Sequence, residues 1–575
     1  MKKLKKLVGL VLALAMVMGL TVTSFAADSY TITINNSTDG YVYTAYQIFD
    51  GDLSYEYEEY TQSSAPTDGT QLYTYDSSTD TYTEAAYADV GTFYVRNTVL
   101  SNITWGNGIT EAGIAAVKAK YNTDDAAEVA AKITTEAEAE AFAKVIGSYV
   151  TNGTASTDVG DTYTISVGEA GYYLIANTTV PEKDSAYTSY ILEVVDNVTV
   201  DPKSDIPSLD KTVSDINDSD NSTVQGDTDS ADYDIGDAVP FTLTATLPTN
   251  YSDYSSYKLV FHDTMSSGLT FNSNSVKVTI DDTKIDSSNY SVTPTTDTAG
   301  ITSVTITFND LKTTAATASS KVVVTYTATL NEEASFKEVN DAWLEYSNNP
   351  NKDSDTGKTP DDKTTVFTFN LTVNKKDSSG NDLSGAGFTL YKYDGTKYNP
   401  VIAGYDQVTI DNAEAYNAGI TAGITYYTYN STTKAYEASI SYTAGTDYYV
   451  SYTEITGTNL TTFIWNGLDD GRYKLVETTT PSDYNTMEDV EFVIAATHTE
   501  DTVSSLTITD LNGNTLSGYT ATAFTGIITA DITNYKGSEL PSTGGIGTTI
   551  FYVIGGIIIA GAAVLLVTRR RMRRA

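Results

Sequence analysis

The stretch Val322-Val-Val-Thr-Tyr-Thr-Ala-Thr-Leu330 decides the fold class of this chain. From Val324 onward its residues alternate with a period of two, and most are β-branched or aromatic, as in a strand with one buried face. The runs Phe241–Leu247 and Phe367–Val373 have the same pattern. The sequence therefore predicts a mainly β protein built from sandwich domains.

One segment, from Glu111 to about Val150, departs from this pattern. It is rich in Ala, Glu and Lys, which have high helix propensity, and its Ala and Ile residues recur at helical spacing. We expect one or two helices here, added to the sheet framework of the first domain.

Two stretches, Pro202–Pro207 and Asn348–Asp362, concentrate Pro, Asn, Asp and Lys, and the apolar periodicity stops in both. Such stretches are typical of linkers, and they divide the chain of 575 residues into three domains between two targeting ends. The expected segments are a signal peptide at 1–26, an N-terminal domain at 27–203, a middle domain at 204–360, a C-terminal domain at 361–537 and a sorting segment at 538–575.

Both ends carry targeting signals. Residues 1–26 combine four lysines, an apolar run and the small-residue pattern Ser24-Phe25-Ala26 of a signal-peptidase site. Near the other end, Ile546–Val567 is apolar and long enough to span a bilayer, and five arginines follow it closely. We therefore expect an exported chain with a C-terminal transmembrane helix and a cytoplasmic arginine tail.

The composition excludes most familiar enzyme chemistries. The chain has no cysteine and two histidines, so it has no disulfide, no thiol nucleophile and no cysteine-based zinc site. Without the nine basic residues of its ends, it retains 25 basic and 74 acidic residues, a net charge of −49 that repels nucleic acid. The acidic stretch Asp215–Asp237 lacks EF-hand spacing. We expect a solvated loop there, with no metal site and no cofactor.

Strand parity places charged side chains on core faces, because alternate residues of a strand point to the same side. In the C-terminal domain, Lys375 ends an apolar row that begins at Phe367, while Lys376 points the other way. Glu477 and Asn534 likewise end apolar rows on their own strands. A lysine, a glutamate and an asparagine are therefore predicted to face inward.

The middle domain has the same pattern at Lys211, Asp263 and Asn340. Burial lowers the pKa of a lysine and raises that of an acid, because it disfavours the charged forms. We hypothesise a self-made amide cross-link in each domain. The neutral lysine attacks the asparagine carbonyl, the protonated acid hydrogen-bonds that carbonyl and shuttles the proton, and ammonia leaves. The alternative is a buried salt bridge beside a hydrogen-bonded asparagine, or a lysine that extends out to solvent.

The motif Leu540-Pro541-Ser542-Thr543-Gly544 stands just before the apolar span and the arginine tail. This order resembles the tripartite cell-wall sorting signal of Gram-positive surface proteins, which a sortase cysteine cuts between Thr and Gly. The resemblance implies an acyl-enzyme on Thr543 that an amine nucleophile resolves.

The internal motifs resemble those of the backbone pilins of Gram-positive sortase-assembled pili, over essentially the whole chain. The stretch Gly467–Pro481 is similar to the family's E-box, which implies that Glu477 catalyses an isopeptide bond. Lys375-Lys-Asp-Ser-Ser-Gly with Leu383–Tyr391 resembles the opening of the collagen-adhesin B-type domain, whose lysine reacts. Ile532-Thr-Asn534 matches the family's acceptor asparagine.

In the middle domain, three stretches resemble the pilin isopeptide domain of the collagen-adhesin A-type class, an Ig-like β-sandwich. The resemblance implies that Lys211 is the nucleophile, Asp263 the acid and Asn340 the acceptor. Asn348 and Asn349 are competing acceptors. Parity favours Asn340, because Asn348 shares its face but lies beyond the apolar run. The three stretches are Tyr233–Phe241, Asp263–Phe271 and Asn340–Pro350.

Val198-Thr-Val-Asp-Pro-Lys203 resembles the pilin motif V-x-V-x-P-K. Its two valines occupy the face opposite Lys203, so the lysine faces outward and is reachable by the Thr543 acyl-enzyme of a second chain. Asp201 stands where many relatives have an aromatic residue, which leaves the identity of the sortase open.

The first domain contains an echo of the third. The stretch Tyr173–Pro181 aligns without gaps on Tyr473–Pro481, so the two domains are expected to share a strand and its exit turn. Asn177 stands at the position of Glu477. The first domain therefore lacks the acid, and we expect no cross-link there.

These features point to a structural protein: the shaft subunit of a surface pilus, polymerised by sortase between Thr543 of one subunit and Lys203 of the next. The implied partners are pilus and housekeeping sortases, identical subunits and peptidoglycan, while minor pilins and host ligands stay open. A monomeric wall-anchored adhesin needs Thr543 but no acceptor lysine. A surface hydrolase needs two carboxylates across a cleft, which no motif provides.

Overall fold

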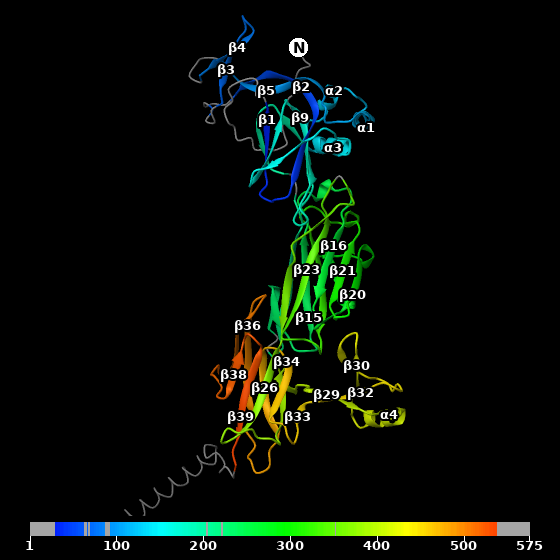
Figure 1. The fold of residues 1–575 in the computed structure, drawn as a ribbon, viewed down its shortest axis with the longest axis vertical. Coiled ribbons are helices and arrows are strands. Elements are labelled where there is room, and N and C mark those ends of the chain that lie inside the picture. Colours follow the sequence, from blue (N-terminus) through cyan, green and yellow to red (C-terminus); the bar gives the residue numbers. More distant parts are fainter. Residues whose placement is uncertain are drawn as a thin grey trace, which may run out of the picture.

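The computed structural model describes residues 29–61, 66, 70–86, 92–202, 205–219, 222–350 and 352–536. They are mainly β and form three units that follow one another along an elongated molecule (Figure 1). The signal peptide, Lys203, the sorting motif and the apolar stretch 546–567 lie outside the described residues. Within the described ranges, no helix has the length and apolar character to cross a membrane.

The first unit packs two sheets together and adds helices. One sheet has the order β11-β1-β8-β7 and the other β10-β9-β2-β5-β3-β4. One core, which includes Ile34 and Ile165, brings together side chains of both sheets, and a second, which includes Phe49 and Leu174, joins sheet and helices. The strands are β1 (Tyr30–Asn35), β2 (Val42–Tyr60), β3 (Leu72–Asp76), β4 (Thr81–Ala85), β5 (Phe93–Trp105), β6 (Thr154–Ala155), β7 (Thr157–Asp158), β8 (Thr162–Val167), β9 (Gly171–Thr179), β10 (Ser189–Val194) and β11 (Val198–Val200).

Three helices, not the one or two expected, fill the Ala- and Glu-rich segment: α1 (Glu111–Tyr121), α2 (Ala126–Ala130) and α3 (Glu136–Ile146). Each begins at its own N-cap, because the side chains of Thr110, Asp125 and Thr135 each accept a hydrogen bond from a first-turn amide. Local capping therefore splits the segment, while its helical character and its place on the first unit are confirmed.

The middle unit is a sandwich of two sheets, ordered β13-β12-β15-β22-β18-β19 and β14-β25-β23-β16-β21-β20. Along β22, alternate residues from Val322 to Leu330 are buried, as the period of two predicted. The strands are β12 (Ser208–Asn217), β13 (Ser222–Thr228), β14 (Ser230–Asp232), β15 (Ala238–Thr246), β16 (Leu259–Met265), β17 (Leu269–Phe271), β18 (Lys277–Ile280), β19 (Thr283–Lys284), β20 (Ser291–Thr296), β21 (Thr302–Phe308), β22 (Lys321–Leu330), β23 (Lys337–Ser347), β24 (Thr356–Lys358) and β25 (Asp362–Phe367).

The third unit pairs a sheet of order β34-β26-β39-β38 with one of order β28-β27-β35-β36-β37. A separate small sheet, β29-β32-β30-β31, projects beside them with α4 (Ala413–Thr421), a helix that the sequence analysis did not predict (Figure 1). The strands are β26 (Phe369–Asp377), β27 (Gly387–Tyr393), β28 (Tyr398–Pro400), β29 (Gly404–Val408), β30 (Tyr427–Asn430), β31 (Ala435–Ala438), β32 (Tyr448–Tyr452), β33 (Glu454–Thr456), β34 (Thr462–Leu468), β35 (Gly471–Thr479), β36 (Val490–His498), β37 (Val503–Thr509), β38 (Tyr519–Thr522) and β39 (Ile527–Asn534).

The middle and third units are joined almost without a linker. Strand β25 pairs with β23 in the middle unit, and β26 of the third unit begins at Phe369, directly after Thr368. The boundary expected after residue 360 therefore falls before the last strand of the middle sheet. Val366 packs in the middle core and Phe367 in the third, so one short segment of chain serves both.

Candidate functional site

Lys375, Glu477 and Asn534 meet inside the third unit. Strands β26 and β39 are parallel neighbours, so Lys375 and Asn534 lie close together at one end of that sheet. Glu477 reaches them from β35 of the other sheet. Exposed fractions are 0%, 5% and 1% for the three residues in that order, so the group is closed off from water.

The three side chains form one hydrogen-bonded group. Lys375 Nζ donates to Asn534 Oδ1 and lies 3.1 Å from Glu477 Oε1. Asn534 Nδ2 donates to both Glu477 oxygens, at 2.7 and 3.0 Å. The Met487 amide donates to Glu477 Oε2 at 2.7 Å and fixes the carboxyl. Burial lowers the pKa of Lys375, although Glu477 partly opposes the shift, and this favours the neutral amine that a nucleophile requires.

The middle unit holds the second group. Lys211 lies on β12 of one sheet, while Asp263 on β16 and Asn340 on β23 lie on neighbouring strands of the other. The distance from Lys211 Nζ to Asp263 Oδ2 is 2.6 Å, and neither side chain is exposed. Burial lowers the pKa of Lys211, with Asp263 opposing the shift. The group therefore spans the two sheets of the sandwich.

Tyr326 completes this group and was missed by the sequence analysis. Its hydroxyl donates to Asp263 Oδ2 at 2.7 Å and accepts from Asn340 Nδ2 at 2.8 Å. Within the described part of the chain, Asn340 Oδ1 and Asp263 Oδ1 are buried without a hydrogen-bond partner. Burial, and next Asp263, raises the pKa of Tyr326 well above its usual value, so the phenol keeps its proton. Parity did carry a signal, because Tyr326 lies on the buried face of β22.

The competing asparagines lie elsewhere. Strand β23 ends at Ser347, and the main-chain carbonyl of Asn348, just beyond it, accepts from the Tyr187 amide of the first unit at 2.6 Å. The side chain of Asn349 donates to Asp355 at 2.9 Å. Of Asn340, Asn348 and Asn349, it is Asn340 that contacts the group around Lys211, through its hydrogen bond to Tyr326.

The corresponding position of the first unit has a structural role. Asn177 Oδ1 accepts from the Thr188 amide at 2.5 Å, and its Nδ2 donates to the Ala186 carbonyl at 3.1 Å. The hydroxyls of Tyr173 and Tyr473 each donate to the carbonyl four residues earlier, at 2.7 and 2.9 Å, so β9 and β35 are built alike. Asn177 therefore ties together the turn after β9.

The strand that precedes Lys203 is β11, which pairs in parallel with β1. Val200 is buried and Thr199 exposed, and Asn35 Nδ2 donates to Asp201 Oδ1 at 3.0 Å. This fixes the strand just before the motif lysine. Lys203 and Thr543 themselves lie outside the described residues.

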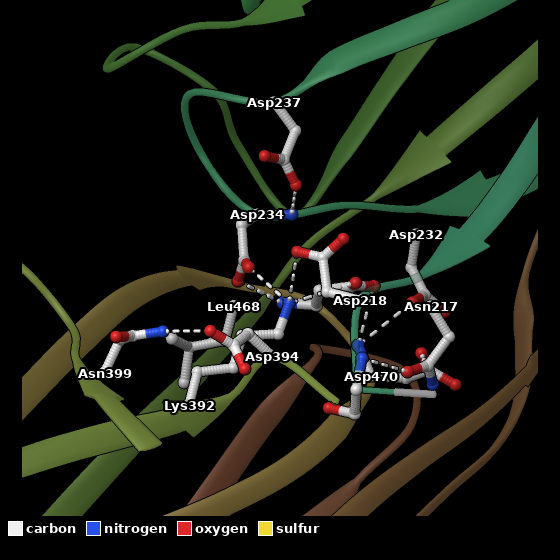
Figure 2. Close-up of polar contacts among 12 residues, drawn as sticks. Asn217, Asp218, Asp232, Asp234, Asp237, Lys392, Asp394, Asn399, Leu468 and Asp470 are labelled. Atoms are coloured by element: carbon white, nitrogen blue, oxygen red, sulfur yellow. Dashed lines mark hydrogen bonds and ion pairs between the residues drawn. The ribbon is translucent and has the colours of Figure 1, made fainter. Parts of the chain in front are cut away.

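The acidic stretch Asp215–Asp237 is not the solvated loop expected from its composition. It includes the end of β12, all of β13 and β14, and side chains buried against the third unit. Lys392 of β27 reaches into it, with Nζ 3.3 Å from Asp218, 3.2 Å from Asp469 and in contact with Asp234 (Figure 2). Composition could not reveal this burial, because the balancing cation comes from another unit.

His498 is a second basic residue of the third unit that reaches this stretch. Its Nε2 lies 3.2 Å from Asp232 Oδ2, and its Nδ1 shares a 2.8 Å hydrogen bond with the Ser230 hydroxyl. Burial opposes its protonation, but Asp232 prevails and raises the pKa of His498. Two groups of three carboxylates each bring their oxygens within 4.8 Å of one another, as a metal site would. Lys392 and His498 already contact these carboxylates and supply the balancing positive charge, so we assign no metal ligands here. The two carboxylate groups are Asp218, Asp234 and Asp237, and Asp232, Asp469 and Asp470.

Comparisons with known proteins agree with this architecture. Residues 235–350 match the family model for the Gram-positive pilin backbone subunit 2, Cna-B-like domain, and residues 532–572 match the LPXTG cell wall anchor motif. The trypsin-resistant surface T6 protein of Streptococcus pyogenes serotype M6 is 27% identical over 408 residues, which cover 64% of this chain and 70% of that relative. The chain is a Gram-positive backbone pilin. It is an exported, cell-wall-anchored protein of a surface pilus.

Solved structures similar to the pilin include two major pilins. The T6 backbone pilin of serotype M6 Streptococcus pyogenes has a TM-score of 0.46 and 16% identity, over 90% of the pilin and 100% of that chain. The major pilin SpaD of Corynebacterium diphtheriae has a TM-score of 0.42 and 16% identity, over 88% and 98%. The family model describes the middle unit as Cna-B-like, in agreement with the predicted collagen-adhesin A/B-type sandwich fold.

The junction between the middle and third units should weaken as the pH rises. Burial, and next Asp232, raises the pKa of Asp470 to about 8, and burial with Asp234 raises that of Asp237 to about 7. An aspartate in the unfolded chain has a pKa of about 4. The stability contributed by these protonated groups is therefore fully present below that pH and is lost as the pH rises through their pKa values in the folded protein. We expect the calorimetric midpoint to fall by about 5 °C between pH ~5.5 and pH ~8.5.

Asp470→Asn should reduce this fall, because the amide does not titrate and still accepts the hydrogen bond from Asn217. Asp161→Asn, at an exposed acid of the first unit, serves as the matched control and should leave the fall unchanged. An equal or higher midpoint at the alkaline pH in the wild type would contradict the assignment.

Proposed function

We propose that the pilin is the repeating shaft subunit of a covalent pilus. Sortase joins Thr543 of one subunit to Lys203 of the next, and the bonds Lys211–Asn340 and Lys375–Asn534 tie each subunit internally. The domains are those expected at 27–203, 204–360 and 361–537, except that β25 belongs to the middle domain and moves the second boundary to Thr368. The observation that carries the proposal is the closed group of Lys375, Glu477 and Asn534, with its three reacting functions in mutual contact.

In the third unit, the proposed reaction forms a bond from Lys375 Nζ to Asn534 Cγ and breaks the bond from Cγ to Nδ2. Glu477 lies 3.1 Å from the attacking nitrogen and 2.7 Å from the leaving nitrogen, so one carboxyl can move the proton between them. Ammonia leaves with that proton. The buried site excludes water, which would otherwise solvate the ammonium form of the lysine.

In the middle unit, the proton path is longer. Asp263 contacts Lys211 Nζ directly, but the hydroxyl of Tyr326 stands between Asp263 and the leaving nitrogen of Asn340. We assign Tyr326 as a relay that passes a proton from Asp263 to Nδ2 as the amide bond forms. The products are again one amide and one ammonia molecule.

The two bonds differ in where they carry force. Lys375–Asn534 would join β26 and β39, the first and last described strands of the third unit. Lys211–Asn340 would join the two sheets of the middle unit. In the middle unit the acceptor Asn340 does not lie on the last strand, because β24 and β25 follow β23. Strand β25 pairs with β23 before the chain enters β26, so tension would still reach the tied strand.

Loss of the third-unit bond should destabilise that unit. Lys375→Ala is expected to lower its thermal midpoint by about 10 °C, because a covalent tie across a long loop contributes about 3 kcal/mol. Lys376→Ala is the control, since Lys376 makes a surface ion pair with Asp382 and should change the midpoint by less than about 1 °C. Differential scanning calorimetry measures both variants, and equal midpoints would count against the bond.

Polymerisation should depend on Lys203. Lys203→Ala is expected to abolish the ladder of wall-linked multimers on denaturing gels and to leave a wall-linked monomer, because Thr543 can still pass to peptidoglycan. The control is Lys183→Ala, at a half-exposed lysine of the first unit paired with Asp361, and its ladder should persist. A wild type that yields only monomers would instead support the monomeric adhesin.

A further inference from the structure

The chain contains a duplicated tyrosine module. Tyr73-Thr-Tyr-Asp-Ser-Ser-Thr79 with Tyr82 aligns at equal spacing on Tyr427-Thr-Tyr-Asn-Ser-Thr-Thr433 with Tyr436. The N-terminal tyrosine module comprises 55–60, 72–85 and 93–97, and the C-terminal tyrosine module comprises 404–408, 427–438 and 448–452. The order β2-β5-β3-β4 of the first corresponds strand by strand to β29-β32-β30-β31 of the second.

The two modules also match ring by ring. Tyr57 stacks on Tyr82 at 3.7 Å between centroids, and Tyr405 stacks on Tyr436 at 3.9 Å. The edge contacts repeat too, because Tyr82 meets Tyr94 at 5.2 Å and the equivalent pair in the second module is 5.0 Å apart. The pairing register agrees, with Tyr75 opposite Tyr82 and Tyr429 opposite Tyr436. Both hairpins turn through a residue in the left-handed region, Asp80 and Lys434.

The C-terminal tyrosine module has a described partner. Tyr429 donates to Glu333 of the middle unit at 3.3 Å, and Lys434 forms an ion pair with the same carboxylate at 2.5 Å. The amide of Glu332 donates to the carbonyl of Lys434 at 3.1 Å. This copy therefore docks its tyrosine-lined hairpin on a turn with two adjacent glutamates.

The N-terminal tyrosine module projects from the far end of the first unit, away from the middle unit (Figure 1). Arg96 occupies the position of Ser451 on its tyrosine face, opposite Tyr57 in the strand pairing. The guanidinium lies over the rings of Tyr55 and Tyr73, at 4.3 and 5.1 Å, and forms no ion pair with a described residue. This face thus presents a cation on an aromatic platform.

Arg472 shows which group a guanidinium stacked on tyrosine rings binds in this protein. Between residues 27 and 543, Arg96 and Arg472 are the only arginines. Arg472 also lies over two tyrosine rings, at 4.8 and 5.3 Å, and it pairs with the carboxylate of Glu491 at 2.7 Å. A stacked guanidinium is held in place to bind a carboxylate, so Arg96 is suited to an acidic group from outside its own module.

We propose that the face of the N-terminal tyrosine module around Arg96 binds a carboxylate-bearing turn of a second copy of the pilin. The C-terminal copy already docks on such a turn, and a chain with 74 acidic residues offers many. The choice of a second copy rests on the proposed shaft role, in which subunits lie next to one another. At the hairpin tip the N-terminal copy has Asp80 where the C-terminal copy has Lys434, which pairs with Glu333. Because Asp80 would repel that carboxylate, the N-terminal copy should bind a different turn from Glu332–Glu333.

Site-specific photo-crosslinking tests this contact in the chain from Ala27 to Gly545, which keeps the Thr543–Gly544 bond that sortase cuts. Tyr75→p-benzoylphenylalanine places the probe on the tyrosine face, where Tyr75 is 40% exposed. The control is Thr83→p-benzoylphenylalanine, on the opposite face of the same hairpin. Mixing isotope-labelled and unlabelled subunits identifies bonds between molecules, and peptide mapping identifies the captured turn. Irradiation is done before and after sortase polymerisation, so the covalent ladder is scored separately.

We expect the Tyr75 probe to capture an acidic turn of a second copy, and Arg96→Ala to reduce the yield about tenfold, as for loss of a charge-assisted pair. Arg96→Lys should restore part of the yield, while the Thr83 probe should capture none. A ladder without intermolecular capture would overturn the docking and leave the shaft role intact. Capture without a ladder would overturn the shaft role and support the docking. Capture of any molecule other than the pilin would overturn the docking.

Discussion

A lysine that is kept from water, with a carboxyl and an amide as its polar neighbours, is the constraint on which the middle and third units depend. Burial of a charge costs several kcal/mol unless its partners are held in place, so the strands around Lys211 and Lys375 must fix both partners. Parallel pairing of β26 and β39 does this in the third unit. In the middle unit, the two sheets and Tyr326 do it together. The same constraint holds each lysine beside the acid and the asparagine of the proposed amide bond.

Much of this was predictable from the sequence. The period of two gave the strands, and parity placed Lys375, Glu477 and Asn534 inward, because a strand has two faces and an apolar row marks the buried one. The sequence did not predict Tyr326 as a partner, since parity places a tyrosine in the core but not its hydroxyl beside Asp263. Strand order and sheet membership depend on contacts between distant segments, and β25 was accordingly assigned to the wrong side of a boundary.

The largest error of the sequence reading concerns charge. A run of aspartates is expected to be exposed to solvent unless basic side chains from elsewhere in the chain pair with it. Here those side chains are Lys392 and His498, which belong to the third unit and could not be assigned to this stretch from its own sequence. The junction they form joins the middle and third units through side-chain contacts, in addition to the short connection at Thr368. The two tyrosine modules also carry basic side chains that suit carboxylates outside their own module. One docks on the middle unit through Glu333, and the other presents Arg96 at the far end of the molecule.

The central claim is that the two buried groups have reacted, and intact mass tests it most directly. The exported chain from Ala27 to Thr543 should weigh less than its sequence mass by two ammonia molecules. Lys375→Ala should lack one of these losses, and Lys211→Ala with Lys375→Ala should lack both. Fragment spectra should join the peptide of Lys211 to that of Asn340, and the peptide of Lys375 to that of Asn534. A wild-type mass equal to the sequence mass would contradict the account and leave both groups as buried salt bridges.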